Sequence, residues 1–283
     1  MPHAVIVGVD GSPESRAAAE WAAGEARLRG LPLSLVCVLE PVPEPVVRAP
    51  LLGAETRQRW SDRIPQEYAE ELHVRHPDVE VGLRWLTGRP GQLLPGLARD
   101  DRALLVLGSR GLGGVAGALL GSVALAAVAH AERPVVLVRA GVPAAREGAE
   151  DLAGDPCSRA ARRPVVVGVD AGQPPVSVLA FAFDAAARRR TSLRVLHAGA
   201  GQGPTAAVAE TLRPWCRAFP HVTIVDEVRP GGAAPHLVAA SWDASLIVVG
   251  RRSRRFPVGT RVGPVTHGVL HRAVCPVAVV PHA

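Results

Sequence analysis

The stretch VIVGVD, residues 5–10, decides the fold because the chain repeats it as VVVGVD at residues 165–170. The offset between these two stretches is 160 residues. Further along, an offset of 142 matches LLVLG, which ends at Gly108, to LIVVG, which ends at Gly250. The sequence therefore predicts two copies of one domain, the second shorter between its second and third strands.

The two copies are predicted over residues 1–140 and 163–283. Residues 141–162, between them, are rich in Ala, Gly, Pro and charge and show no apolar period. Such a composition is typical of a linker.

Short apolar runs alternate with amphipathic stretches in the first copy. The pattern predicts strands over 4–9, 33–39, 79–85, 103–108 and 135–139, and helices over 14–29, 55–75, 92–100 and 122–131. Continuously apolar strands indicate burial on both faces, and hence a parallel sheet between two helical layers. A ligand of such a sheet binds beyond the carboxyl ends of the strands, where the strand order reverses.

Composition excludes several classes of protein. The chain is 48% hydrophobic over 283 residues, which predicts a globular protein with room for two cores. It has no apolar run of membrane-spanning length and no charged signal-peptide head, so we expect a cytoplasmic protein. Lysine is absent, which excludes a Walker A loop and Schiff-base chemistry. The four cysteines, which form no CxxC pair, predict neither a disulfide framework nor a zinc site: Cys37, Cys157, Cys216 and Cys275.

The glycine-rich stretch LLVLGSRGLGGVAGALLGSVALAAVAH, residues 104–130, admits two interpretations. From Gly111 it fits G-x-G-x-x-A, the dinucleotide fingerprint, but the next strand ends in Arg139 where that fingerprint needs an acid. From Gly108 it fits G-x2-G-x9-G-S, ending at Ser122, where free helix amides and a hydroxyl could hold a triphosphate at micromolar strength. The alternative is that Ser122 is only a helix cap and the glycines only a surface loop.

With VGVDGS at 7–12 and LVCVLEP at 35–41, this loop makes both copies resemble the universal stress protein family, in its ATP-binding branch. The resemblance implies two tandem Rossmann-like domains of the adenine nucleotide alpha hydrolase-like type. Each would have a five-stranded parallel sheet of order 3-2-1-4-5 with helices on both faces. It also implies ATP, with or without Mg²⁺, lying across strands 1 and 4, and a nucleotide-dependent regulatory role in the bacterial stress response.

The resemblance assigns roles to three groups of residues in the first copy. Next to ribose and adenine it places Gly8, Val9, Asp10 and Val38; along the sugar and phosphates Leu107, Gly108, Arg110 and Gly111; and around the phosphates Gly121, Ser122, Val123 and Ala124. Each has a simpler alternative. Asp10 could belong to a turn that starts the helix, Arg110 could be a solvated loop charge, and Val38 could be core.

The second copy departs from this pattern at the phosphate loop. It keeps Gly250 and Gly263, and Asp170 survives on its first strand, but Pro264 stands where the first copy has Ser122. Proline removes an amide and a hydroxyl donor together. We therefore expect a weak or vestigial second site and one nucleotide per chain.

The net charge of +6 arises in the second copy, where residues 163–283 carry 14 arginines and 6 acids. Four of these arginines flank Ser253: Arg251, Arg252, Arg254 and Arg255. They predict a cationic loop that either recognises a polyanion or is simply solvated. Because no aromatic residues are interleaved with the arginines, nucleic acid is not an expected partner.

Catalytic and metal-binding patterns are sparse. His267 and His271 are spaced i, i+4, but a metal site needs further ligands, so none is predicted. No residue resembles a dedicated base for ATP hydrolysis. Two alternatives to a regulatory module therefore remain: a slow ATPase, and a nucleotide-independent interaction or dimerisation protein with a vestigial pocket.

Two apolar strands would lie at sheet edges, PVVLV at 134–138 and PVAVV at 276–280. An exposed apolar edge needs a partner. The resemblance suggests that these terminal strands pair between the copies, making the chain a pseudo-dimer, with a homodimer of chains as a further expectation.

Overall fold

The computed structural model describes residues 2–40, 54–100, 102–109, 120–140, 163–170, 174–198, 206–253 and 262–282, with side chains given for all of these except 54–64 and 206–207. We refer to the described residues up to 140 as the first half and to those from 163 onward as the second half. The predicted linker, residues 141–162, lies outside the described residues.

The first half alternates strands and helices. Its elements are β1 (Val5–Val9), α1 (Pro13–Arg29), β2 (Leu33–Leu39), α3 (Ala54–Arg75), β3 (Val81–Thr87), α4 (Pro90–Asp100), β4 (Leu104–Ser109), α5 (Ser122–His130) and β5 (Val135–Arg139). Most predicted bounds are confirmed to within a residue. The exceptions are β3, which begins two residues later because Val79 closes a turn onto His76, and α4, which begins earlier because Pro90 is a favourable first helical residue.

The second half repeats this order. Its elements are β6 (Val165–Val169), α7 (Val176–Arg189), β7 (Leu193–Ala198), α8 (Ala206–Ala218), β8 (Ile224–Arg229), α9 (Ala233–Ala240), β9 (Leu246–Arg252), α10 (Pro264–Arg272) and β10 (Val277–His282). The strand registers repeat the two sequence offsets: Val5 pairs with Leu104 in β1–β4, and Val165 pairs with Leu246 in β6–β9.

All ten strands form one sheet of order β3-β2-β1-β4-β5-β10-β9-β6-β7-β8. Each half contributes five parallel strands in the predicted order 3-2-1-4-5, which confirms the predicted fold class. The strand order reverses between β1 and β4 in the first half, so the carboxyl ends of these two strands are where this fold places a ligand.

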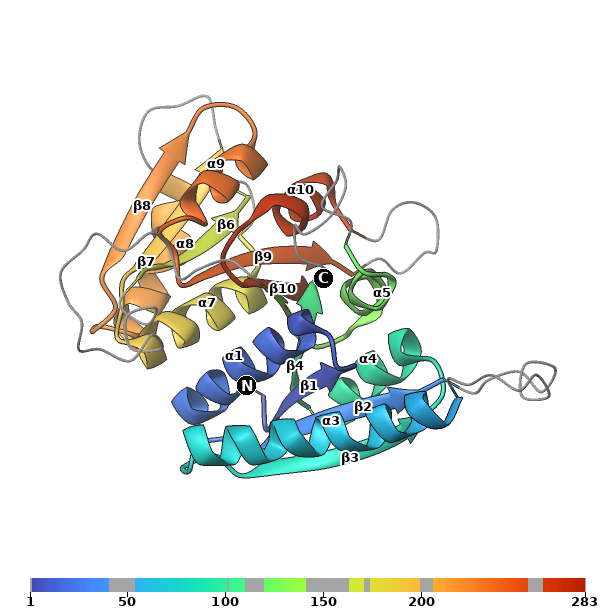
Figure 1. The fold of residues 1–283 in the computed structure, drawn as a ribbon. Helices are drawn as coiled ribbons and strands as arrows, with labels where there is room; N and C mark the ends of the chain where they lie inside the picture. The colour runs from blue at the N-terminus through green and yellow to red at the C-terminus, as the bar shows by residue number, and fades with distance from the viewer. Residues whose placement is uncertain are drawn as a thin grey trace, which may run out of the picture.

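Helices cover both faces of the sheet, and each face has its own apolar core (Figure 1). Buried side chains of α1, α3, α7 and α8 form one core, and those of α4, α5, α9 and α10 form the other. Both cores run through both halves, so burial of apolar surface holds the halves together. None of the helices in the described ranges is long and apolar enough to cross a membrane.

The halves meet through the two terminal strands, which pair antiparallel with Val277 opposite Leu137 and Val279 opposite Val135. Pairing satisfies the backbone groups that either strand would expose alone. The predicted pairing between copies therefore occurs within one chain. Because β5 and β10 each have a neighbouring strand on both sides, neither offers a free edge to a second chain. The homodimer stays a prediction.

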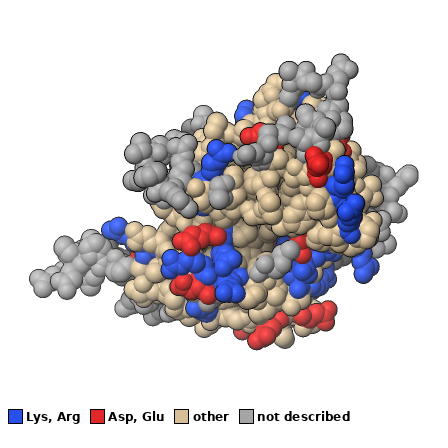
Figure 2. Space-filling view, turned by 180° about the vertical axis from the view of Figure 1, so that it is seen from behind, with Lys and Arg blue, Asp and Glu red and all other residues tan. Residues whose placement is uncertain are grey.

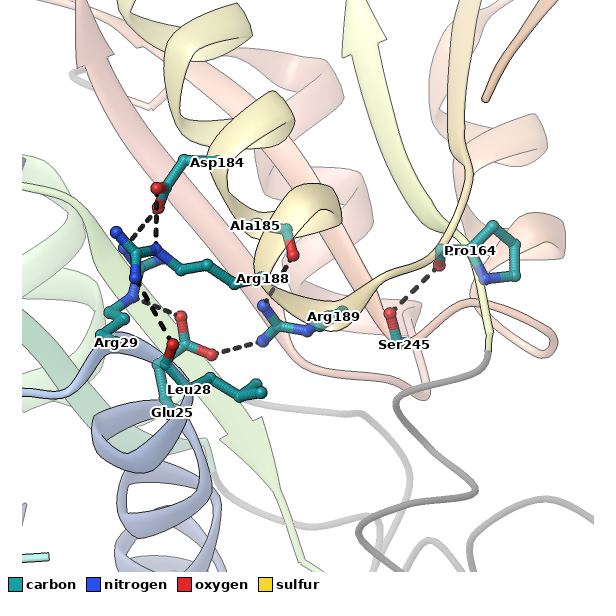
Figure 3. A network of polar contacts seen from close by, with 9 residues as sticks. All are labelled: Glu25, Leu28, Arg29, Pro164, Asp184, Ala185, Arg188, Arg189 and Ser245. Atoms are coloured by element: carbon teal, nitrogen blue, oxygen red, sulfur yellow. Dashed lines mark hydrogen bonds and ion pairs between the residues drawn. The ribbon is translucent and has the colours of Figure 1, made fainter. Parts of the chain in front are cut away.

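Beside the strands, α1 and α7 meet through a network of buried ion pairs (Figure 3). Arg29 lies 2.6 Å from both Glu25, on its own helix, and Asp184 of α7. Arg189 of α7 pairs with Glu25, and Arg188 lies 2.8 Å from Asp184. Burial opposes the charge of Glu25, but the guanidinium groups of Arg189 and Arg29 outweigh it, and the pKa of Glu25 is lowered. The network ties the halves together through charges that neither half could leave buried alone.

Candidate functional site

The end of β1 carries a polar turn that leads into α1. The backbone N–H and the hydroxyl of Ser12 donate to Asp10 Oδ1 at 3.0 and 2.6 Å. Ser12 Oγ accepts from the N–H of Ser15 at 3.1 Å and thereby caps α1, whose first residue is Pro13. The turn and helix-start interpretation of this stretch is thus confirmed, and the same turn fixes the orientation of the Asp10 carboxylate.

Asp10 is an exposed residue, but its carboxylate is partly covered by the turn, and the hydrogen bonds of the turn favour its charged form. Burial raises its pKa, but the hydrogen bonds from Ser12 and Ser15 outweigh that effect, so the pKa of Asp10 lies below its ordinary value. An ionised carboxylate accepts hydrogen bonds and donates none. At this position it suits a ligand that offers hydroxyl groups.

A cavity of about 130 Å³ lies at the carboxyl ends of β1 and β4. Eight of the twelve residues predicted for the first site line it: Gly8, Val9, Asp10, Val38, Leu107, Gly108, Val123 and Ala124. The fold therefore brings together residues that lie more than a hundred positions apart in the chain. The cavity is where the reversal of strand order places a ligand.

Two of these glycines have different structural reasons. A Cβ at Gly8 would lie 2.7 Å from Leu107 Cδ2 and 3.0 Å from Leu94 Cδ1, on the side of the sheet that holds the cavity. A Cβ at Gly108 would lie 2.7 Å from the backbone of Glu14 in α1, on the opposite side. Gly108 is thus required for packing of α1, and only its backbone is available to the cavity.

A second, larger cavity of about 680 Å³ adjoins the first, since Pro90 and Val123 line both. Ser122, at the first turn of α5, lines the larger cavity. The preceding residue, Gly121, is the N-cap of α5 and provides no side-chain hydrogen bond to the helix amides. These amides carry the partial positive charge of the helix N-terminus, and their N-cap residue offers them no side-chain acceptor.

Three predicted residues are not placed in either cavity. Arg110 and Gly111 lie outside the described residues, as does the loop up to residue 119. Gly121 lines neither cavity, although its neighbour Ser122 does.

Other lining residues were not predicted. In the small cavity these are Ser12, Ser15, Val36, Pro90 and Leu94. The two serines carry a sequence signal, because they belong to the stretch DGSPES, residues 10–15, which predicts a turn and a helix start after Asp10. The residues of α4 carried none, because they reach the cavity through helix packing.

The predicted residues of the second half lie in a different environment. The hydroxyl of Thr266, in α10, donates to the carbonyl of Gly250 at 2.9 Å. On the other side of the sheet, a Cβ at Gly250 would lie 2.9 Å from the ring of His282. Gly263 is the N-cap of α10, with Pro264 as its first residue, and Asp170 is an exposed residue after β6.

The predicted cationic loop begins differently from our expectation. Arg251 belongs to β9, is 8% exposed, and donates to the carbonyl of Ala131 at the end of α5. It is therefore a contact between the halves and not a loop charge, because β9 continues beside β10 as far as Arg252. Arg254 and Arg255 lie outside the described residues. On the face drawn in Figure 2, arginines lie in small groups, several beside acidic side chains, and form no continuous basic surface.

Metal-binding and thiol groups are few. The rings of His267 and His271 lie 4.3 Å apart between centroids. In the described ranges no three His, Cys, Asp or Glu side chains gather as a metal site. Cys37, Cys216 and Cys275 form no disulfide, and Cys157 lies outside the described residues. Burial raises the pKa of the Cys275 thiol to about 12, which makes it unreactive.

Comparison with known proteins agrees with this architecture. The model of the universal stress protein family matches residues 1–139 and 205–281. Universal stress protein Rv1996 of Mycobacterium tuberculosis is 33% identical over 315 aligned positions, covering 97% of this chain and 94% of its own. Universal stress protein Rv2623 of the same organism is 32% identical, covering 97% and 95%.

Among solved structures, a universal stress protein from Archaeoglobus fulgidus matches the whole of both chains with a TM-score of 0.74 at 17% identity, which shows a common fold. Family model, full-length relatives and fold agree. The chain belongs to the universal stress protein family.

Proposed function

We propose that this protein is a cytoplasmic ATP-binding regulatory module whose nucleotide is held by the first half. The observation that carries the proposal is the cavity at the ends of β1 and β4, which is lined by eight residues of the predicted site and adjoins the N-terminus of α5.

The two cavities suit different parts of ATP. Small-molecule sites usually occupy about 300–1,000 Å³, so a cavity of about 130 Å³ accommodates only part of the nucleotide. The adenine ring would pack against its apolar walls, Val38 and Leu107, and the Asp10 carboxylate at the exposed side is suited to accept from ribose hydroxyls. The phosphates would then lie in the larger cavity, against Ser122 and the amides of α5.

Titration of the full chain with ATP by calorimetry tests this proposal. We expect micromolar affinity and one nucleotide per chain, since the second half offers neither the serine nor an open strand end. Two equivalent sites per chain would contradict the assignment to the first half.

A charge at the N-cap of α5 gives a sharper test. In Gly121→Asp the new side chain is a good helix cap, so the fold is retained, but its negative charge lies beside the phosphates. At about 5 Å and an effective dielectric constant of about 20 the repulsion is roughly 3 kcal/mol, so we expect at least a tenfold weaker affinity.

Gly263→Asp is the matched control, because Gly263 is the N-cap of α10 with a similar backbone conformation. It should leave ATP affinity unchanged. If Gly121→Asp also binds ATP normally, the phosphates do not lie at α5 and the proposed site is wrong.

A further inference from the structure

The larger cavity is a groove between α4 and α5, beside the proposed phosphate position. Its walls contain several polar and charged side chains: Glu40, Arg89, Gln92, Arg99, Ser122, His130 and Glu132. Of these, only Ser122 belongs to the predicted site. The remaining groups therefore need an explanation of their own.

Arg89 is held at the start of α4 by its neighbours. The N–H of Gly88 donates to the carbonyl of Leu39 at 2.9 Å, and Gly88 adopts a φ of +144° that side chains rarely allow. The carbonyl of Arg89 accepts from the N–H groups of Gln92 and Leu93, both at 3.0 Å. Its backbone is thus fixed before any ligand binds.

Close packing brings this end of α4 beside the first turns of α5. A Cβ at Gly91 would lie 3.1 Å from Ala126 Cβ and 4.0 Å from the Cα of Val123. The absent side chain lets the two helices approach, so the N-termini of α4 and α5 border the same groove. Both helix dipoles then favour negative charge at this end.

The two arginines of the groove differ in their partners. Arg99 lies 3.1 Å from Asp100 and 3.8 Å from Glu132, so its charge is already balanced. Arg89 is an exposed residue, and within the part of the chain that the structure describes it forms no ion pair with a carboxylate, whereas Arg99 forms two. An unbalanced guanidinium on the wall of a groove is suited to bind an anion, and two phosphate oxygens match its geometry.

We propose that Arg89 binds the phosphate chain of the nucleotide and makes this site bind ATP more tightly than adenosine. This inference rests on the proposed function. The chain has no lysine, and Arg89 and Arg99 are the arginines that line this groove among the described residues. Ser122 and the amides of α5 would hold one side of the phosphate chain, and Arg89 would hold the other.

The second half offers a contrast to this arrangement. It repeats the tripeptide Arg-Pro-Gly at residues 229–231, but Arg229 is the last residue of β8 and lies 3.0 Å from Glu227. Its charge is balanced within its own strand. This agrees with a cationic phosphate contact in the first half alone.

The experiment compares ATP and adenosine binding to the full chain by calorimetry. Loss of a charge-assisted hydrogen bond predicts about tenfold weaker ATP binding in Arg89→Ala, with adenosine affinity unchanged. Arg89→Lys keeps the charge without the bidentate geometry, so it should lose less than Arg89→Ala. Arg99→Ala is the matched control in the same groove, and its ATP affinity should stay within about twofold of the wild type.

Three results would overturn the role of Arg89 while the proposed function stands. They are an unchanged ATP affinity in Arg89→Ala, an equal loss for ATP and adenosine, and an equal loss in Arg99→Ala. If the wild-type chain binds no ATP, the proposed function fails and this inference fails with it. Matching thermal unfolding of each variant and the wild type shows that the measured losses are not due to misfolding.

Discussion

The two halves have the same strand order but opposite arrangements at the ends of their fourth strands. In the first half, Gly108 and Ala124 both line the small cavity, and Ala124 offers only a methyl group. In the second half, Thr266 takes the place of that alanine, and its hydroxyl bonds to the carbonyl of Gly250. The same fold thus leaves a strand end open in one copy and satisfies it internally in the other.

The difference extends to the strands themselves. β9 continues to Arg252 alongside β10, and the N–H of Ser253 donates to the carbonyl of His282 at 2.6 Å. In the first half the described pairing of β4 with β5 runs as far as Ser109, opposite Arg139, and the counterpart of Ser253 lies outside the described residues. The backbone N–H that follows β9 is therefore satisfied by the protein itself in the second half. The exchange of Ala124 for Thr266 thus changes the surroundings of the fourth strand without changing the topology.

The largest effect is expected in the buried ion-pair network between α1 and α7. The two halves contribute equivalent arginines to it, Arg29 and Arg189, but acids at different positions, Glu25 and Asp184. Arg29→Ala removes one of the two arginine partners of each buried acid, leaving Glu25 with Arg189 alone and Asp184 with Arg188 alone. We expect the free energy of unfolding to fall by about 3–5 kcal/mol, measured by urea denaturation. Arg75→Ala, which removes exposed ion pairs with Glu20 and Glu71, should cost at most about 1 kcal/mol. Equal losses in the two variants would contradict a special role for the buried network.

Acid titration of the same network gives its pH dependence. The pKa of Glu25 is lower in the folded chain than in the unfolded chain, so its ion pairs contribute fully above the unfolded value of about 4.3. This contribution is lost as the pH falls through the lower, folded value. In Glu25→Gln that loss of stability between neutral and acidic pH should be smaller, and an unchanged pH profile would exclude Glu25 as its source.

The next effect tests the proposed phosphate contact by giving the first half the proline that the second half has at the start of its last helix. Ser122→Pro removes a hydroxyl and an amide donor, so ATP affinity should fall about a hundredfold, equivalent to about 3 kcal/mol, in calorimetric titration. The urea midpoint should not change, because proline suits a first helical position and Gly121 already has an extended conformation, with φ of −61° and ψ of 147°.

The reverse exchange, Pro264→Ser, sharpens the same comparison. It restores both donors to the second half, but Thr266 and the paired end of β9 remain. We therefore expect one nucleotide per chain in this variant as well. A second binding site would show that the proline alone had closed the second half.

The smallest effect concerns the hydroxyl of Thr266, which donates a hydrogen bond to the carbonyl of Gly250 in the second half. Thr266→Val keeps the volume of the buried side chain and removes its bond to Gly250, which should cost about 1 kcal/mol of unfolding free energy. ATP affinity should not change, since the first half is untouched. A measurable change in affinity would mean that the two halves are coupled through α10.

Much of the fold could be predicted from the sequence because its signals are local. Alternation of apolar runs with amphipathic stretches predicted the elements, and the doubled VGVD motif predicted two copies of one domain. The strand order came from the resemblance to the universal stress protein family. Asp10, Gly108 and Ser122 follow strands or precede helices, so their positions at one edge of a parallel sheet follow from topology. Whether they bind ATP is a question for the titrations above.

Only the tertiary structure decided the rest, because the groups involved are distant in sequence. Arg89 and Leu94 reach the cavities through packing of α4 against α5, which no local pattern encodes. Arg29 meets Asp184 across 155 residues, and this pairing appears only when α1 and α7 are docked. Residues 251–255 predicted a cationic loop, yet Arg251 is buried between the two halves, where it bonds to Ala131. The reason is that the pairing of β9 with β10 extends the strand through Arg251. A sequence specifies which side chains are available. Their burial and ion pairing depend on neighbours that only the folded chain supplies, and these determine the protonation state and the contacts of each side chain.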